Sequence, residues 1–305
     1  MKVSVIISIY KTRKELIRKT LLSILNQTYT NLEVIIIFDG CIDEEIRYIK
    51  KVTACDSRVQ FIQNSENIGL TKSLHKGLEA SSGNFIARID DGDIWRKDKI
   101  ERQVEFLKEN KNCVLVGTNY KCFTQSESNS IPKRYLPVSN KLIKKWLFIG
   151  KNPFLHSSIM FRSNLVNYNI NASTSQDYEL YTRLYFFGEM ANLSDQMVDF
   201  LIDDDSISFK RDHEQFFNHL KMHYQFLDAH QKKIDRSKFI SDGANLKYKF
   251  RFESYRKSYM KFMLVQVNKI GKKSLLGRVF KNILIPDILL YSIRKKYLSI
   301  LDSIS

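Results

Sequence analysis

Two almost continuous apolar runs constrain the fold of this chain more than any other feature of its sequence. They cover residues 3–9 and 32–38 and consist mainly of valine and isoleucine. A strand with one face in water alternates apolar and polar residues, whereas a strand buried on both faces is apolar along its length. The two runs therefore predict strands of a parallel sheet that helices cover on both faces.

The segments that follow these runs alternate between helical and strand patterns. Apolar residues recur at helical spacing in some segments and form short runs in others. The expected helices cover residues 12–25, 43–52, 71–80 and 97–110, and the further strands cover residues 59–63, 85–89 and 114–118. This alternation predicts an α/β fold with a doubly wound, mainly parallel sheet.

Polar residues follow three of the expected strands. Tyr10 and Asp39 come directly after the first two, and Asp90, Asp91 and Asp93 place three carboxylates within four residues after another. Ligands bind outside the carboxyl ends of the strands in such sheets, and hard cations such as Mg²⁺ prefer carboxylate oxygen. The acidic cluster is either a cation site or a solvated turn, and the coincidence of three strand ends favours a site.

The later part of the chain is less regular. A polar loop is expected at residues 122–140, a strand at 157–161, and helices at 141–148 and 177–187. From residue 209 onward the pattern is helical, basic and aromatic. We therefore expect one α/β domain over residues 1–210 and a helical extension over residues 211–305.

The net charge is concentrated in this extension. Residues 210–305 carry 21 lysines and arginines against 8 aspartates and glutamates, which is +13 of the total of +16. Such an asymmetry indicates an anionic partner, either a membrane surface or nucleic acid. Residues 271–301 have the pattern of a basic amphipathic helix, which can lie in the membrane interface. The alternative is a set of helices packed on the domain with a solvated basic face.

Composition also bounds the location of the protein. No run of 18 or more apolar residues is present, so a membrane-spanning helix is not expected. The cysteines share no metal-ligand spacing and are typical of reduced thiols: Cys41, Cys55, Cys113 and Cys122. We expect a cytoplasmic protein. The sequence leaves open whether the basic extension also binds the inner face of the membrane.

Seven segments form a pattern when they are read together: residues 5–10, 25–29, 35–40, 67–77, 90–93, 156–162 and 176–180. Their order and spacing over residues 1–210 closely resemble the family 2 glycosyltransferases, which have the GT-A fold. Bacterial members that build capsule, lipopolysaccharide or other surface polysaccharides are the most similar. The resemblance implies a GT-A-like domain that binds a nucleotide-diphospho-sugar and a divalent cation.

The resemblance assigns several residues to this donor. Tyr10 would stack on or flank the base, and Asp39 would accept a hydrogen bond from uracil, which favours a UDP-sugar. Lys72 would face the diphosphate from the first turn of a helix, and Asp90 would contact ribose. The donor-side set is Ser8, Tyr10, Asp39, Asn67, Lys72, Arg88 and Asp90. Four of these residues have a structural alternative. It is an ordinary half-buried tyrosine for Tyr10, a turn residue for Asp39, a solvated lysine for Lys72 and a structural ion pair for Arg88.

The family's metal-binding aspartate falls on Gly92 in this chain. Binding of Mg²⁺ or Mn²⁺ would then fall to Asp91 or Asp93, and the sequence leaves both open. A cation there would neutralise the diphosphate leaving group.

The resemblance also implies the catalytic base. Asp177, at the start of a helix, corresponds to the family's base and would take the proton of the acceptor hydroxyl. Its alternative role is a first-turn acid that favours the helix dipole. His156 would begin a strand on the acceptor side or be a structural histidine. Asp203 stands where many members have a histidine that reaches the metal.

The implied activity is transfer, with inversion, of a sugar from a nucleotide-diphospho-sugar to a hydroxyl of a growing, lipid-linked surface glycan. One alternative is a non-catalytic nucleotide-sugar-binding protein, since Phe38, Gly92 and Gln176 depart from the family pattern. A second is a basic nucleic-acid-binding protein. Nucleic acid is not the expected partner, because the strand-end carboxylates would repel phosphate.

Overall fold

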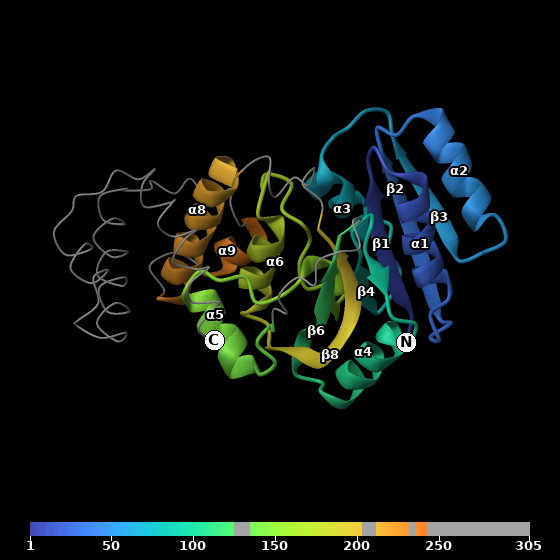
Figure 1. Cartoon of the computed structure of the whole chain (residues 1–305). Helices are drawn as coiled ribbons and strands as arrows, with labels where there is room; N and C mark the ends of the chain where they lie inside the picture. Colours follow the sequence, from blue (N-terminus) through green and yellow to red (C-terminus); the bar gives the residue numbers. More distant parts are fainter. Residues whose placement is uncertain (125–134, 203–211, 232–235, 243–305) are drawn as a thin grey trace. The chain divides into compact units, whose positions relative to one another are not determined.

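A computed structural model describes residues 1–124, 135–202, 212–231 and 236–242 of the chain. Within these residues an eight-stranded sheet lies between two layers of helices (Figure 1). The α/β class expected from the sequence is confirmed.

The sheet has a parallel half and a mixed half. β1 to β4 are parallel neighbours. In the other half, β7 is antiparallel to β4 and β6, β8 is parallel to β6, and β5 is antiparallel to β8. The spatial order is β3-β2-β1-β4-β7-β6-β8-β5. The strands are β1 (Val3–Ile9), β2 (Leu32–Asp39), β3 (Val59–Asn64), β4 (Phe85–Arg88), β5 (Ile94–Trp95), β6 (Cys113–Phe123), β7 (Met160–Arg162) and β8 (Glu189–Leu201).

Helices cover both faces of the sheet, which explains why β1 and β2 are apolar without alternation. Val5 and Ile7 of β1 belong to the core on one face, and Ile6 belongs to the core on the other. The first core contains residues of α1 (Lys14–Leu25), α2 (Asp43–Thr53) and α4 (Lys99–Glu109). The second contains residues of α3 (Leu70–Glu79), α5 (Asn140–Phe148), α6 (Gln176–Leu184), α8 (Asp212–His230) and α9 (Arg236–Asp242).

The expected strand at residues 157–161 is wrong in its extent. Residues His156–Ser158 form a short 3-10 turn, and β7 begins only at Met160. The hydroxyl of Ser157 accepts the backbone N–H of Asp90, and that of Ser158 accepts the backbone N–H of Thr118. These side chains therefore satisfy neighbouring backbone groups outside a strand ladder, and His156 does not begin a strand.

The mixed half of the sheet is larger than the sequence pattern predicts. The strand expected at residues 114–118 continues to Phe123 as β6, so the expected loop at residues 122–140 begins later. The strand that pairs with β6, β8, has no counterpart among the elements expected from the sequence. The two strands pair along most of their length, with register shifts that interrupt the ladder.

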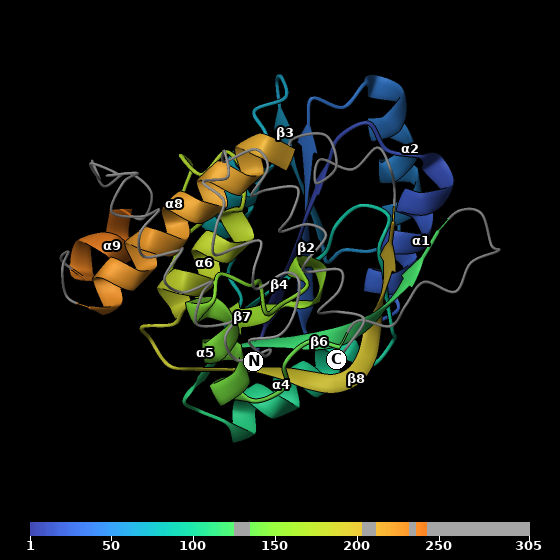
Figure 2. The same ribbon diagram turned by 60° about the vertical axis from the view of Figure 1, so that its left-hand side comes forward.

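The helical pattern expected from residue 209 is confirmed for α8 and α9. α8 contacts α6 and α5, and the three helices lie side by side in Figures 1 and 2. The basic segment at residues 271–301 lies outside the described residues, and the domain boundary at residue 210 stays a prediction. Within the described ranges, no helix is both long and apolar enough to span a bilayer.

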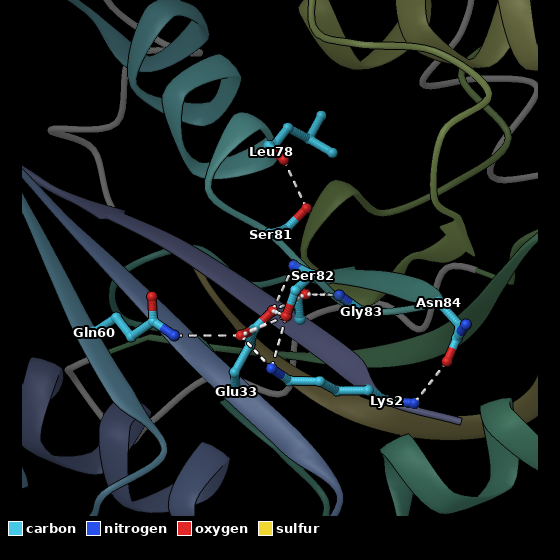
Figure 3. Close-up of polar contacts among 9 residues, drawn as sticks. Lys2, Glu33, Gln60, Leu78, Ser81, Ser82, Gly83 and Asn84 are labelled. Atoms are coloured by element: carbon cyan, nitrogen blue, oxygen red, sulfur yellow. Dashed lines mark hydrogen bonds and ion pairs between the residues drawn. The ribbon is translucent and has the colours of Figure 1, made fainter.

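A buried carboxylate organises the amino-terminal end of the parallel strands (Figure 3). Glu33 of β2 accepts hydrogen bonds from the Lys2 Nζ at 2.6 Å, the Ser4 hydroxyl at 2.5 Å and the Ser82 backbone N–H at 2.7 Å. Burial alone would raise the pKa of Glu33, but these hydrogen bonds outweigh it and lower the pKa to about 2. The carboxylate thereby ties β1 and β2 to the turn that leads into β4.

We expect Glu33→Gln to destabilise the protein by about 2–3 kcal/mol at pH 7, because the amide cannot accept all of these donors. The carboxylate's contribution is complete above its unfolded pKa near 4.5 and is lost as the pH falls toward 2. Urea unfolding at pH 7 and pH 3 measures this difference. Glu44→Gln, which removes an exposed ion pair with Lys14, is the control and should leave the stability nearly unchanged.

Candidate active site

The candidate donor site lies where β1, β2 and β4 end. Tyr10 directly follows β1, and 44% of its surface is exposed, so its ring is available for stacking. Ser8 lies two residues earlier, half-buried. The carboxyl ends of the parallel strands thus bring Ser8, Tyr10, Asp39 and Asp90 to one edge of the sheet.

Asp39 is buried and holds the turn before α3. Its carboxylate accepts the backbone N–H groups of Ile68 and Gly69 at 2.9 and 3.1 Å, and the Asn64 side-chain amide at 3.0 Å. The Asn67 side-chain oxygen accepts the same Gly69 N–H at 2.9 Å. The structure therefore gives Asp39 and Asn67 a turn-forming role. Their contact with a nucleotide stays a prediction.

This turn presents the amino-terminal end of α3. The helix is capped by Gly69 at a φ of +89°, without a capping side chain. Lys72 is exposed on the first turn, and its ammonium forms no ion pair within the described ranges. A free helix N-terminus with a nearby cation favours an anionic ligand.

Arg88 and Asp90 form a two-pronged ion pair at the end of β4. The guanidinium of Arg88 is almost entirely buried, while the side chain of Asp90 remains 39% exposed. The pair directs Arg88 toward Asp90 and away from solvent. The charge of Arg88 would therefore act on a ligand mainly through the Asp90 carboxylate, which Arg88 holds in place.

Asp91 and Asp93 carry buried oxygens that lack hydrogen-bond partners in the described residues. Burial, reinforced by the charge of Asp90, raises the pKa of Asp91 to about 6 and raises that of Asp93 as well. Asp93 also accepts the backbone N–H of Leu201 at 2.9 Å. Unpaired carboxylate oxygens of this kind suit Mg²⁺ or Mn²⁺.

These residues fit a cation that is shared with a ligand. The described residues contain no group of three or more histidine, cysteine, aspartate or glutamate side chains placed to hold a metal. A Mg²⁺ ion on a phosphate substrate needs only one or two protein carboxylates, because phosphate and water complete its shell. Asp91 or Asp93 would supply them.

Gly92 has a structural reason to replace an aspartate. Its φ is +98°, and a Cβ added there would lie 2.8 Å from the Leu201 side chain. The positive φ disfavours any side chain here, whereas the Leu201 methyl group at the end of a flexible side chain could shift. The departure at this position therefore follows from the backbone conformation of the acidic turn.

Asp177 faces the acidic turn from another element. It lies in the first turn of α6, and its carboxylate accepts the Asn152 side-chain amide at 2.5 Å. The buried Tyr181 is close enough to Asp177, Arg88 and Asp90 for all three charges to influence its pKa. The charges of Asp177 and of the Arg88–Asp90 pair at the end of β4 thus all act on one buried tyrosine.

His156 is part of the protein interior at this point. Its Nε2 is 2.8 Å from the Tyr168 hydroxyl, and burial together with the Arg88 charge lowers its pKa well below the usual value. The imidazole is therefore neutral and held by a structural contact. Asp203, the second residue expected on the acceptor side, lies outside the described residues.

Sequence reasoning missed three residues of this site. Asn152 contacts Asp177, and the charges of Asp177 and Arg88 both influence the pKa values of Tyr168 and Tyr181. The Tyr181 hydroxyl is buried and has no hydrogen-bond partner in the described part of the chain. The available signal for Asn152 was its position beside a proline, shortly before the His156 motif. In the sequence, Tyr168 and Tyr181 look like ordinary core residues of a loop and of a helix.

Comparison with known proteins agrees with this arrangement. The model of glycosyl transferase family 2 matches residues 4–168. The amylovoran biosynthesis glycosyltransferase AmsE of Erwinia amylovora is 29% identical over 216 residues, which cover 68% of this chain and 79% of that protein. An uncharacterized glycosyltransferase of Haemophilus influenzae is 28% identical over 226 residues, covering 70% and 69% of the two chains.

Solved structures support the fold. Residues 1–349 of S. aureus TarS in complex with UDP-GlcNAc superpose with a TM-score of 0.60 at 16% identity, covering 90% of this chain and 82% of that chain. The mannosyltransferase PcManGT from Pyrobaculum calidifontis, in complex with GDP-Man and Mn²⁺, gives a TM-score of 0.53 at 15% identity, covering 76% and 64%. The fold is that of a GT-A glycosyltransferase. The chain belongs to glycosyl transferase family 2.

We expect Asp91→Asn to stabilise the protein when EDTA is present. Ionising the buried carboxyl at pH 8 costs free energy, and a pKa raised to about 6 corresponds to about 2 kcal/mol after allowance for partial solvent access. The gain should be complete above pH 6, shrink as the pH falls from 6 toward 4, and vanish only below the unfolded-state pKa of 3.8, where wild-type Asp91 is protonated in both folded and unfolded states.

Thermal unfolding at pH 8 and pH 4.5 measures this difference. Asp195→Asn, at an exposed carboxylate paired with Arg102, is the control and should leave the melting temperature nearly unchanged. A lower melting temperature for Asp91→Asn at pH 8 would mean that the carboxylate is stabilised in the folded state, contrary to this expectation.

Proposed function

We propose that this glycosyltransferase moves a sugar from a nucleotide-diphospho-sugar, a UDP-sugar in particular, to a hydroxyl of a growing surface glycan. The transfer inverts the anomeric carbon and uses Asp177 as the general base. The observation that supports the proposal is the Asp177 carboxylate in the first turn of α6, held by the Asn152 amide and close enough to Tyr181 to influence its pKa together with Arg88 and Asp90. A carboxylate able to take a proton would then act near the strand ends where nucleotides bind in such folds.

The donor would lie along the ends of β1, β2 and β4. Tyr10 offers a ring for the base, Asp39 and Asn67 form the wall next to it, and Lys72 with the α3 N-terminus would bind phosphate oxygens. Asp90, held by Arg88, keeps exposed oxygens that can accept ribose hydroxyls. Ser8 would approach the donor from the same edge of the sheet.

A divalent cation, when bound at Asp91 or Asp93, would neutralise the charge that develops on the diphosphate leaving group. On the other side of the sugar, Asp177 would accept the proton of the attacking hydroxyl while Asn152 holds its carboxylate. One base without a second carboxylate nucleophile fits direct displacement and hence inversion.

The acceptor is proposed from the relatives. AmsE is named for amylovoran biosynthesis, which supports a surface polysaccharide as the product. A lipid-linked acceptor would place the enzyme on the cytoplasmic face of the membrane, and the basic extension at residues 211–305 would suit that anionic surface.

We expect Asp177→Asn to lower the rate of sugar transfer by about 100-fold or more, since the amide cannot accept the proton. UDP binding should change little, because Asp177 lies on the acceptor side. Nucleotide release from the donor and UDP affinity by calorimetry measure the two effects. Asp195→Asn, which changes an exposed carboxylate outside the site, is the control. An Asp177→Asn enzyme with wild-type activity would exclude this base.

A thermal-shift panel of UDP-Glc, UDP-Gal, UDP-GlcNAc and GDP-Man, each with and without Mn²⁺, tests the donor class. We expect a UDP-sugar to raise the melting temperature in the presence of Mn²⁺, and Asp91→Asn or Asp93→Asn to reduce the Mn²⁺-dependent part. Stabilisation by GDP-Man alone would overturn the UDP assignment. Nucleotide-sugar binding without release of nucleotide would instead favour a non-catalytic binding protein.

A further inference from the structure

The direction of the Asp177 carboxylate depends on a residue from a different loop. Asn152, in the segment between α5 and β7, donates its side-chain amide to Asp177 at 2.5 Å, and its own side-chain oxygen accepts the Phe154 backbone N–H at 3.2 Å. A base at a partly exposed helix start needs such a contact, because a small misplacement of a catalytic group can cost a large factor in rate.

Helix α8 holds the segment that carries Asn152. The His219 Nε2 is 2.8 Å from the backbone oxygen of Gly150, two residues before Asn152. A carbonyl oxygen can only accept, so this nitrogen of His219 carries a proton. Gly150 has a φ of +72° and donates its N–H to Leu147 at the end of α5. The hydrogen bond from α8 thus fixes the chain where it leaves α5.

The same helix also holds the start of α6. The ring of His219 packs on the ring of Tyr178, the residue after Asp177, with the centroids 4.1 Å apart. The Tyr178 hydroxyl donates to the backbone oxygen of Leu147 at 2.9 Å, and the Nδ1 of His223 is 2.9 Å from that hydroxyl. Since the hydroxyl proton points to Leu147, His223 donates to Tyr178.

A third contact lies just before α6. The Asn218 side-chain amide donates to the Thr174 hydroxyl at 2.9 Å, and the Ser175 hydroxyl donates to the backbone oxygen of Gln215 at 3.3 Å. Ser175 caps α6 in the left-handed conformation, at a φ of +53°, which costs free energy unless its surroundings hold it. α8 therefore holds the chain on both sides of the Asp177–Asn152 hydrogen bond.

We propose that α8 positions the catalytic base, with His219 as the positioning residue that fixes the Asn152 segment against the start of α6. The inference rests on the proposed role of Asp177 as the base. The proposal assigns α8, which lies after the expected domain boundary at residue 210, to the active site. Any role of the extension in binding an acceptor or a membrane would be additional.

The experiment compares His219→Ala, His219→Gln and His230→Ala in the full-length chain. Glutamine keeps an N–H donor at a reach similar to that of the histidine Nε2. His230 lies at the end of the same helix and packs on Phe148 and Tyr185 with ring centroids 4.7 and 5.8 Å apart, and within the described residues it makes no contact with residues 149–152 or 174–178. The assay is nucleotide release, with Mn²⁺, from whichever of UDP-Glc, UDP-Gal, UDP-GlcNAc and GDP-Man gives the highest wild-type rate.

We expect His219→Ala to lower kcat by about tenfold or more without changing the donor KM, because the base moves while the donor site stays intact. His219→Gln should restore most of the rate, and His230→Ala should retain the wild-type kcat. An unchanged kcat in His219→Ala overturns the proposal. Equal losses in the alanine and glutamine variants, or a parallel rise in KM, also overturn it, since they indicate packing alone.

Asn152→Ala tests the same link from outside α8, which keeps the proposal open to refutation even if His219→Ala fails to fold. The kcat of Asn152→Ala should fall. In the double variant with His219→Ala, the fold-loss of kcat should be smaller than the product of the two single losses. If His219→Ala does not fold, Asn218→Ala takes its place in the double variant. Independent, multiplicative effects contradict the proposal. Activity in Asp177→Asn would refute the proposed base itself, whereas an inactive Asp177→Asn with a fully active His219→Ala refutes only the role of α8.

Discussion

The ion pair between the buried Arg88 and the partly exposed Asp90 is the interaction on which the rest of the site depends. Removing Asp90 would leave the guanidinium of Arg88 as an uncompensated buried charge, which is destabilising. The negative charge of Asp90 adds to burial in raising the pKa values of Asp91 and Asp93. The positive charge of Arg88 adds to burial in keeping His156 neutral. One ion pair therefore influences the protonation of the residues around it.

The proposed donor and acceptor sides of the site are built by different means. The donor side uses the ends of parallel strands, whose positions follow from the β1, β2 and β4 ladders and from the Glu33 contacts at the opposite end. The acceptor side has no such ladder. It consists of the start of α6 and the segment after α5, and these are held together by hydrogen bonds from single side chains. Small changes in those side chains should therefore affect the acceptor side more than the donor side.

This difference explains which parts could be predicted from sequence. The run at residues 3–9 coincides with β1, because a strand buried on both faces is visible in composition alone. β8 escaped prediction because polar residues interrupt it, and its pairing with β6 is non-local and irregular. The motif order located Gly92 and Asp177 but gave no reason for the glycine, since the reason is a backbone φ of +98° that short motifs do not reveal. Asn152 and His219 act through contacts that no short sequence pattern encodes.

The hydrogen bond between Asp93 and Leu201 also has a consequence for the order in which the molecule assembles. It joins residues that are 108 positions apart, whereas β1 to β4 find all their parallel partners within the first 88 residues. Contacts between distant segments form later than local ones because the intervening chain must be closed first. During synthesis the nucleotide edge of the sheet can therefore fold while β8 is still emerging. The acidic turn gains its final hydrogen bond only when β8 joins the sheet.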